Sequence, residues 1–175
     1  FPEAVKTLAG GDNPTADPGV NPQQLLNRVA AFYHETFLAT AKPQEYLKSR
    51  GFIKPEIPLA FKAGYADGKL LSTLPKEGPI IETLKQIGIL TAKGRELFYG
   101  CVTFPLFDSN GNVAGLYGRK LENTGQVLHL YLPGKRRGLV NRQAAASSEE
   151  LILTESIIDA LSLYQNGFPH VIPLY

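Results

Sequence analysis

Residues 151–159, Leu-Ile-Leu-Thr-Glu-Ser-Ile-Ile-Asp, limit the fold most strongly because the hydrophobic period changes within them. Leu151 to Leu153 form a short apolar run without helical spacing. The apolar residues that follow recur at helical spacings: Ile157, Ile158, Leu161 and Tyr164. This pattern predicts a buried strand that passes directly into a helix, with Glu155 at the junction. Because ligands bind at the carboxyl ends of strands in open α/β sheets, Glu155 is a candidate metal ligand.

Ser156 and Asp159 allow a second interpretation of the same junction. Their spacing resembles a capping box, which would put Glu155 just outside the helix with its carboxylate free. Acidic residues are also common at helix starts, because the helix dipole favours negative charge there. The spacing alone is therefore consistent with a metal-binding acid and with a carboxylate that only favours the helix end.

The composition indicates an ordinary globular protein. The chain has 175 residues, of which 43% are hydrophobic and 19% charged, and a net charge of +2 does not by itself indicate a nucleic-acid partner. A single cysteine, Cys101, excludes a disulfide scaffold or a zinc site made from this chain and favours a reducing, cytoplasmic compartment. No apolar run approaches the about 20 residues that cross a membrane, so we expect no membrane partner. The chain contains no methionine, even at position 1, so we expect further sequence upstream.

Helical patterns dominate the first half of the chain and strand patterns the second. Residues 1–8 are typical of a helix end, and glycines and prolines then indicate a linker. Asn21 and Pro22 are a favourable helix start, and the alternation on both sides of the turn at 108–112 predicts a β-hairpin. The predicted helices cover 22–37, 43–50, 80–90, 141–146 and 157–164, and the predicted strands cover 101–107, 113–117, 127–132, 151–153 and 171–172. For the last strand, helix and strand we expect a right-handed parallel crossover.

Basic residues gather after the hairpin, and Glu122 is the only acid between residues 120 and 142. The cluster consists of Arg119, Lys120, Lys135, Arg136, Arg137 and Arg142. Arginine presents a planar fork to phosphate oxygens, so the cluster is suited to a phosphate-bearing partner. An ordinary solvated loop would have the same composition.

Three ring side chains accompany these cations. His129 could face the same groove, although a surface histidine without a partner is the simpler interpretation. Tyr117 and Tyr131 could stack on bases, but aromatic residues in strands usually belong to the core. The sequence contains no Walker-type phosphate loop, no histidine cluster and no nucleophile elbow, so covalent catalysis has no candidate.

Five motifs, in the same order, resemble the RNA-polymerase core of bacterial DNA primases of the DnaG type. The opening Phe-Pro-Glu-Ala-Val is similar to the segment that leaves the family's N-terminal zinc-binding domain. The other similar segments are Tyr46 to Gly51, Phe61 to Ala66, the pair Val102 to Leu106 with Gly115 to Arg119, and Glu155 to Asp159. The chain departs from the family's Gly-Gly-Arg by Tyr117 in place of the first glycine. It departs from the Toprim motif Glu-Gly-x-x-Asp by Ser156 in place of glycine.

The resemblance implies a fold and a domain arrangement. We expect an α+β N-terminal lobe of helices and an antiparallel hairpin sheet, followed by the first β-α-β unit of an α/β Toprim fold. Residues 1–20 would be the linker after a missing zinc-binding domain, which alone would hold zinc. Residues 21–148 would form the N-terminal lobe, and residues 149–175 would begin a Toprim domain that is cut off at Tyr175.

The resemblance also implies an activity, namely template-directed synthesis of RNA primers on single-stranded DNA from nucleoside triphosphates. Two Mg²⁺ or Mn²⁺ ions would assist nucleotidyl transfer in the complete enzyme. Glu155 would be a metal-linked acid or proton-transfer group, and Asp159 an orienting or structural carboxylate. Arg119 would contact the template or the incoming nucleotide. Lys120 and Arg142 would also bind nucleic acid or nucleotide, and Lys135, Arg136 and Arg137 would form a basic ridge along the single strand. A replicative helicase would bind through missing regions.

Two alternatives remain open. The family's Asp-x-Asp metal ligands would follow Tyr175, so we expect these 175 residues to be inactive in isolation. If those aspartates do not follow, the chain would be a non-catalytic single-stranded-DNA-binding module of a phage or mobile element. A different Toprim enzyme, a topoisomerase or a nuclease, is the other alternative. A topoisomerase would need a tyrosine nucleophile in a separate domain, whereas Tyr46, Tyr65 and Tyr99 match fold positions of the primase pattern.

Overall fold

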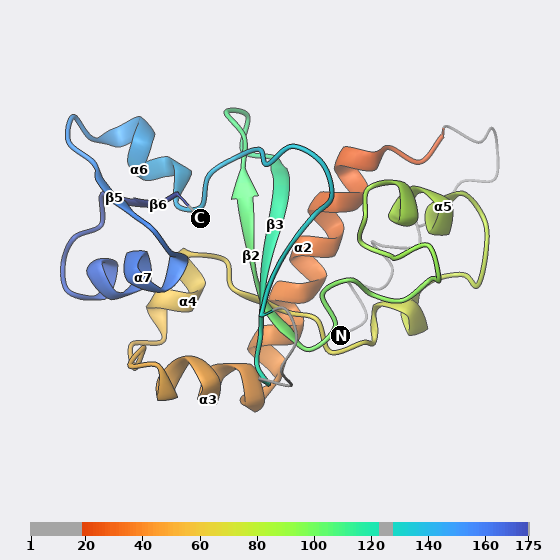
Figure 1. Cartoon of the computed structure of the whole chain (residues 1–175), viewed down its shortest axis with the longest axis horizontal. Helices are drawn as coiled ribbons and strands as arrows, with labels where there is room; N and C mark the ends of the chain where they lie inside the picture. Colours follow the sequence, from red (N-terminus) through yellow and green to blue (C-terminus); the bar gives the residue numbers. More distant parts are fainter. Residues whose placement is uncertain (1–18, 123–127, 175) are drawn as a thin grey trace.

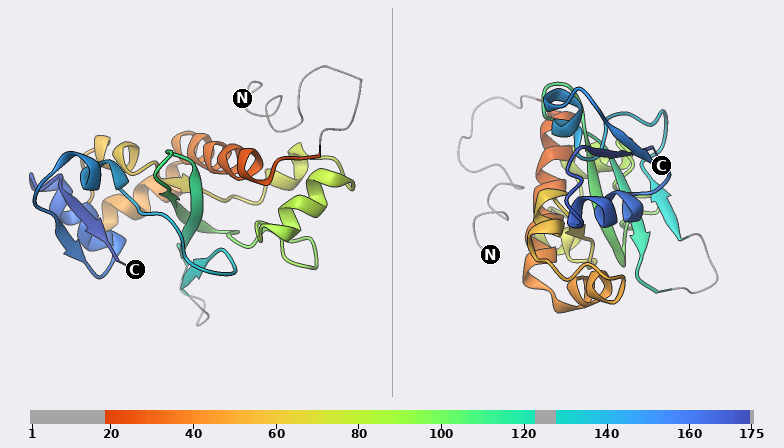
Figure 2. Two further views of the ribbon diagram at one scale, coloured as in Figure 1. Left: turned by 90° about the horizontal axis from the view of Figure 1, so that it is seen from above. Right: turned by 90° about the vertical axis from the view of Figure 1, so that its left-hand side faces the viewer.

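The structure is a computed structural model that describes residues 19–122 and 128–174. The predicted helix end at residues 1–8, most of the predicted linker and Val127 lie outside the described residues. The molecule is elongated, with an antiparallel sheet in the middle, a β5–α7–β6 unit at one end and α5 at the other (Figures 1 and 2). Among the described residues, no helix is both long enough and apolar enough to span a bilayer.

Helix α2 (Pro22–Ala39) is the longest element and confirms the prediction for this segment. The Asn21 side-chain oxygen accepts hydrogen bonds from the backbone N–H groups of Gln23 at 2.9 Å and Gln24 at 3.2 Å. Pro22 at the start of the helix has no N–H that would need a partner. The apolar face packs into the protein through Leu25, Leu26, Val29, Phe32, Tyr33 and Phe37.

Replacing Asn21 by alanine is expected to lower the free energy of unfolding by about 0.5–2 kcal/mol, because two N–H groups lose their acceptor. Denaturant unfolding followed by circular dichroism measures this change. Asn21→Ser is the matched control, since its hydroxyl can still cap the helix and should retain most of the stability. Equal losses in both variants would show that capping is not the cause.

Four short elements directly follow α2: α3 (Ala41–Ser49), α4 (Glu56–Ala60), β1 (Gly64–Tyr65) and the 3-10 helix η1 (Leu70–Thr73). As predicted, α3 ends at a glycine, Gly51, whose φ of 94° lies in the left-handed region. The prediction of a helix over 80–90 is wrong at its end. Helix α5 (Pro79–Gln86) stops because Gly88 adopts a φ of 82°, after which Leu90 forms a β-bridge with Glu96.

The predicted hairpin is confirmed as β2 (Cys101–Phe107) and β3 (Val113–Lys120), which pair antiparallel. They form the centre of a four-stranded sheet in the order β1-β2-β3-β4, with β4 (His129–Tyr131) at one edge. The register shifts between Leu106 and Phe107, just after Pro105, as in a β-bulge. Gly118 of β3 lies against the buried Phe98, and a Cβ there would be only 2.4 Å from the ring. A side chain at this position would therefore collide with the core.

The last part of the chain forms the predicted strand, helix and strand. After α6 (Arg142–Ser147), strand β5 (Ile152–Thr154) leads into α7 (Ile157–Gln165), and β6 (Val171–Pro173) pairs parallel with β5. The prediction of a buried first strand is wrong, because Ile152 is 38% and Leu153 58% exposed. In the described structure β5 pairs only with β6, so much of its apolar surface remains uncovered.

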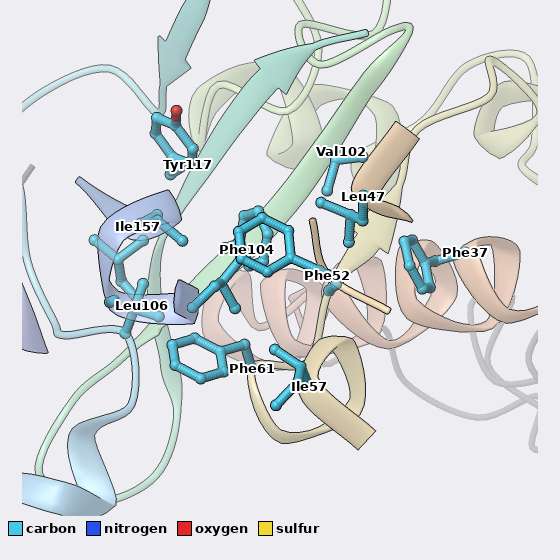
Figure 3. Packing of buried hydrophobic residues seen from close by; sticks show 14 of the residues in the cluster. Phe37, Leu47, Phe52, Ile57, Phe61, Val102, Phe104, Leu106, Tyr117 and Ile157 are labelled. Atoms are coloured by element: carbon cyan, nitrogen blue, oxygen red, sulfur yellow. The ribbon is translucent and has the colours of Figure 1, made fainter. Parts of the chain in front are cut away.

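A continuous apolar cluster joins this unit to the N-terminal lobe (Figure 3). Val102, Phe104 and Tyr117 contribute from one face of the hairpin, and Ile157 contributes from the first position of α7. The cluster also includes Phe61, next to α4, while a second cluster on the other side packs α2 and α5 against the sheet. The strand–helix junction that carries Glu155 is thus docked on a defined face of the sheet.

Candidate functional site

Glu155 lies at the carboxyl end of β5, immediately before Ser156, the N-cap of α7. Ser156 and Asp159 form the predicted cap: the Ser156 Oγ accepts from the Asp159 backbone N–H at 3.2 Å and donates to the Asp159 Oδ2 at 2.7 Å. The Glu155 side chain is exposed, and no described residue forms a hydrogen bond or ion pair with it. The two carboxylates therefore differ, because Asp159 is engaged in the cap and Glu155 points to solvent.

The described residues supply only part of a divalent metal site. A carboxylate oxygen is the ligand type that Mg²⁺ prefers, so Glu155 fits in kind. In the part of the chain that the structure describes, however, no three His, Cys, Asp or Glu side chains come together. Further oxygen ligands would have to come from outside these residues, and we derive no catalytic step through a metal from this geometry.

Arg119 projects from the face of the sheet against which α7 docks. Tyr117 and Ile157 belong to one buried cluster, and Figure 3 shows both on the same side of the hairpin. Alternate residues of a strand point to the same face, so Arg119 lies on the Tyr117 side of β3. The structure thus docks the helix that follows Glu155 on the face of the sheet that carries Arg119.

Arg119 is held by side chains from two other elements. Its Nε donates to the hydroxyl of Tyr46 on α3 at 2.9 Å, and one terminal nitrogen lies 3.0 Å from the Nε2 of His129 on β4. The Nδ1 of His129 in turn lies 2.7 Å from the Tyr117 hydroxyl. We call Tyr46, Tyr117, Arg119 and His129 the Arg119 cluster. It is the most highly connected group of polar side chains on this face.

The protonation states of the Arg119 cluster follow from its geometry and burial. Burial first, and then the positive charge of Arg119, lower the pKa of His129, so its ring is neutral near pH 7. Burial also raises the pKa of Tyr117, which keeps its hydroxyl protonated. Partial burial alone would lower the pKa of Arg119, but its interactions with the nearby hydroxyl groups of Tyr46 and Tyr117 outweigh it and raise the pKa overall. Arg119 is therefore a fixed cation beside a neutral imidazole.

The loop after β4 carries Lys135, Arg136 and Arg137 and continues the site from the edge of the sheet; we call it the basic loop. The ring centroids of Tyr131 and Tyr117 are 5.2 Å apart, and the guanidinium carbon of Arg136 lies 4.1 Å from the Tyr131 ring centroid. The loop then returns over the hairpin, where Leu139 and Phe107 exchange backbone hydrogen bonds at 2.9 and 3.0 Å. A pocket of about 360 Å³ lies under the loop, lined by apolar residues and by Lys135, Arg136 and Arg137.

The structure brings only some of the predicted basic residues together. Lys120 faces the other side of β3, where its Nζ donates to the Tyr99 carbonyl and lies 5.8 Å from the Tyr99 ring centre. Arg142 begins α6 and lines a separate pocket of about 420 Å³ with Lys62 and Asp108. Arg136 is linked to the Arg119 cluster through Tyr131 and Tyr117, and Lys135 and Arg137 are its neighbours in the loop, whereas Lys120 and Arg142 lie elsewhere.

The interpretation of His129 as a histidine without a partner is wrong, since it contacts both Tyr117 and Arg119. The sequence contained a signal for this arrangement: Arg119 follows Tyr117 by two positions at the end of one predicted strand, and His129 and Tyr131 alternate on the next. The register Tyr117–Tyr131 and Arg119–His129 places them opposite one another. Tyr46, 73 positions before Arg119, had no such signal.

Comparison with known proteins identifies relatives of this chain. A family model described as the N-terminal domain of the DNA primase catalytic core matches residues 32–134. The DNA primase of Aquifex aeolicus is 31% identical over 161 residues, covering 84% of this chain and 32% of that protein. The DNA primase of Clostridium acetobutylicum is 27% identical over 198 residues, covering 98% of this chain and 33% of that protein. The chain thus spans about a third of the length of these relatives.

Solved structures share the fold. The zinc-binding and RNA polymerase domains of the Aquifex aeolicus primase superpose with a TM-score of 0.76 at 29% identity, covering 91% of this chain and 44% of that one. The DnaG primase catalytic domain bound to single-stranded DNA superposes with a TM-score of 0.73 at 25% identity, covering 88% and 55%. A structure of the DnaG catalytic core gives a TM-score of 0.76 at 24% identity and covers 87% and 54%.

Proposed function

The chain belongs to the bacterial DnaG-type DNA primases, and from this premise we propose that it is part of a catalytic core that synthesises RNA primers on single-stranded DNA. The substrates would be a single-stranded template and nucleoside triphosphates, and the reaction a nucleotidyl transfer. The observation that carries the proposal is that α7, which begins two residues after Glu155, docks on the face of the sheet that carries Arg119, in a chain whose N-terminal lobe matches the primase family.

The β5–α7–β6 unit supports the proposed domain arrangement. A parallel strand pair joined by a helix, with an acid where the first strand ends, is what the start of a Toprim domain requires. We propose that residues 21–148 form the N-terminal lobe and that the Toprim domain begins at residue 149. A zinc-binding domain of the kind named in the Aquifex aeolicus structure would precede the lobe, and a helicase contact would lie outside the chain.

In the proposed site, Glu155 would help to hold Mg²⁺ or accept a proton, while Asp159 would keep the helix start in place. When bound, divalent cations would neutralise charge on the phosphates and lower the barrier to attack on the α-phosphate. Arg119 would bind a phosphate through its planar fork, and Lys135, Arg136 and Arg137 would follow the strand. Lys120 and Arg142 would add positive charge at the periphery.

A non-catalytic single-stranded-DNA-binding module is the second candidate, but the primase relatives do not favour it. It predicts the same basic surface and no Asp-x-Asp motif after Tyr175. Primer synthesis by the full-length protein, assayed with Mg²⁺, nucleoside triphosphates and a single-stranded template, separates the two functions. The 175-residue chain alone is proposed to bind the template without extending it.

Binding to single-stranded DNA tests the basic loop. Replacing Lys135 and Arg137 together by alanine is expected to reduce the slope of log K against log salt concentration by about 1.4, at about 0.7 for each lost phosphate contact. Fluorescence anisotropy with a labelled oligonucleotide measures the affinity over a series of salt concentrations. Lys93→Ala, an exposed lysine on the turn after α5, is the control and should leave the slope unchanged. An unchanged slope in the double variant would remove the loop from the interface.

A further inference from the structure

We propose that Tyr117 and His129 are positioning residues that hold the Arg119 guanidinium in the orientation that binds a phosphate. This inference rests on the proposed function. The phosphate would belong to the single-stranded template or to a nucleoside triphosphate, since both present the same oxygens. Neither positioning residue needs to touch the ligand, because each acts through Arg119.

The contacts to Arg119 fix the plane of its guanidinium group. Tyr46 binds the Nε at 2.9 Å and His129 lies 3.0 Å from a terminal nitrogen, so two separate nitrogens are held at once. These contacts use two of the five N–H groups, and a bidentate phosphate contact needs two more. A guanidinium with a fixed plane loses less conformational entropy on binding than a free one.

The direction of each hydrogen bond can be assigned, because arginine can only donate. The Nε2 of His129 must accept from Arg119, so it carries no proton, and a neutral ring must then carry its proton on Nδ1. Nδ1–H consequently donates to the Tyr117 hydroxyl across 2.7 Å. Arg119 therefore fixes the histidine tautomer, and Tyr117 stabilises that tautomer by accepting the hydrogen bond from Nδ1–H.

Tyr117 is itself held in place by its aromatic neighbours. The residue is only 5% exposed, and its ring centroid lies 6.3 Å from that of Phe104 and 5.2 Å from that of Tyr131. The ring is thus fixed in the core, and its hydroxyl reaches His129. The primase motif that this segment resembles has glycine at position 117, and glycine offers neither ring nor hydroxyl. The chain of contacts from Tyr117 through His129 to Arg119 thus cannot form in a protein with that glycine.

Oligonucleotide binding by the full-length protein tests the proposal. Tyr117→Phe, which removes only the hydroxyl, and His129→Leu are each expected to weaken binding of a labelled oligothymidylate by about 2–10-fold, the usual effect of one lost hydrogen bond. His129→Gln should retain most of the affinity, because its amide can accept from Arg119 and donate to Tyr117. In an Arg119→Ala background, Tyr117→Phe and His129→Leu should have no further effect.

The pH profile provides a second readout that a purely structural role would not change. As the pH falls through the lowered pKa of His129, the ring gains a proton and can no longer accept from Arg119. The charged and titratable groups around the ring are Tyr117 and Arg119 on β3 and Tyr131 on β4, with Tyr46 of α3 beyond Arg119. The contribution of Arg119 is the ratio of the oligonucleotide affinities measured with Arg119 and with Arg119→Ala. This ratio should therefore fall at acid pH when residue 129 is histidine and stay constant in the His129→Gln background.

Competition with a nucleoside triphosphate in the same assay distinguishes the two sources of phosphate. If Tyr117→Phe and Arg119→Ala have non-additive effects on the affinity for the oligonucleotide only, Arg119 binds the template. If their effects on the affinity for the nucleoside triphosphate are non-additive, Arg119 binds the nucleotide substrate. Two results would overturn the inference: an equal loss of affinity from Tyr117→Phe with and without Arg119, or wild-type affinity in both Tyr117→Phe and His129→Leu. In either case, DNA binding by the wild type would still support the proposed function. Failure of the wild type to bind either ligand would overturn both.

Discussion

Replacing Glu155 by glutamine in the full-length protein is expected to lower the rate of primer synthesis by about 10²–10⁴-fold, the range for loss of a proton-transfer group. The carboxylate ends a parallel strand and is exposed. The amide has nearly the same size, but it carries no charge for a divalent cation and does not accept a proton near pH 7. Incorporation of labelled ribonucleotides on a single-stranded template with Mg²⁺ measures the rate.

The structure also provides the control for this experiment. Asp159→Asn changes a neighbouring carboxylate whose oxygen accepts from Ser156, and an asparagine oxygen can accept the same hydrogen bond. We expect a much smaller loss of activity in this variant. Because Glu155 is exposed and has no hydrogen-bond or ion-pair partner among the described residues, Glu155→Gln should change the free energy of unfolding by less than about 0.5 kcal/mol. Primer synthesis at the wild-type rate in Glu155→Gln would remove Glu155 from the catalytic residues.

Local patterns in the sequence were sufficient for elements whose ends are determined by neighbouring residues. Asn21 and Pro22 located the start of α2, Gly51 located the end of α3, and the alternation around the turn at 108–112 predicted the hairpin. The junction at Glu155 was likewise predicted, together with the cap formed by Ser156. In each case, the residues that decide the local structure lie within a few positions of it.

Other predictions failed where the outcome depends on distant residues or on backbone conformation. The apolar spacing up to Leu90 continued the helical pattern, but Gly88 takes a left-handed conformation and α5 ends earlier. Leu153 is apolar, yet it is exposed because the described structure places no further strand beside β5. Period and hydrophobicity indicate which surface is apolar and not what covers it.

The basic residues show the same limit for the site. Arg119 and Lys120 are adjacent in sequence, but adjacent strand residues face opposite sides of a sheet, so only Arg119 reaches the face on which α7 docks. The partners of Arg119 come from α3 and β4, and the link to Tyr46 spans 73 positions. The sequence therefore predicted the charges, whereas the fold determined which of them act together.

Replacing Phe61 by alanine is expected to lower the free energy of unfolding by about 3–5 kcal/mol, the range for deletion of a buried phenylalanine. Phe61 is 2% exposed and follows α4, where Figure 3 shows its ring beside Ile57 and Leu106. Its ring also meets that of Tyr164 on α7 edge to face, with centroids 5.1 Å apart. The deletion would leave a cavity where the N-terminal lobe supports α7.

The position of this cavity predicts more than a general loss of stability. Phe61 and Ile157 belong to one cluster, so hydrogen exchange of the α7 amides should accelerate more than exchange of the amides in α2, part of which packs in the other cluster. Leu59→Ala, on the same short helix but 43% exposed, should cost less than about 1 kcal/mol and leave α7 protected. Denaturant unfolding and hydrogen exchange of both variants make the comparison. If Phe61→Ala lost stability without faster exchange in α7, the cluster would stabilise the lobe but not the attachment of Glu155 to it.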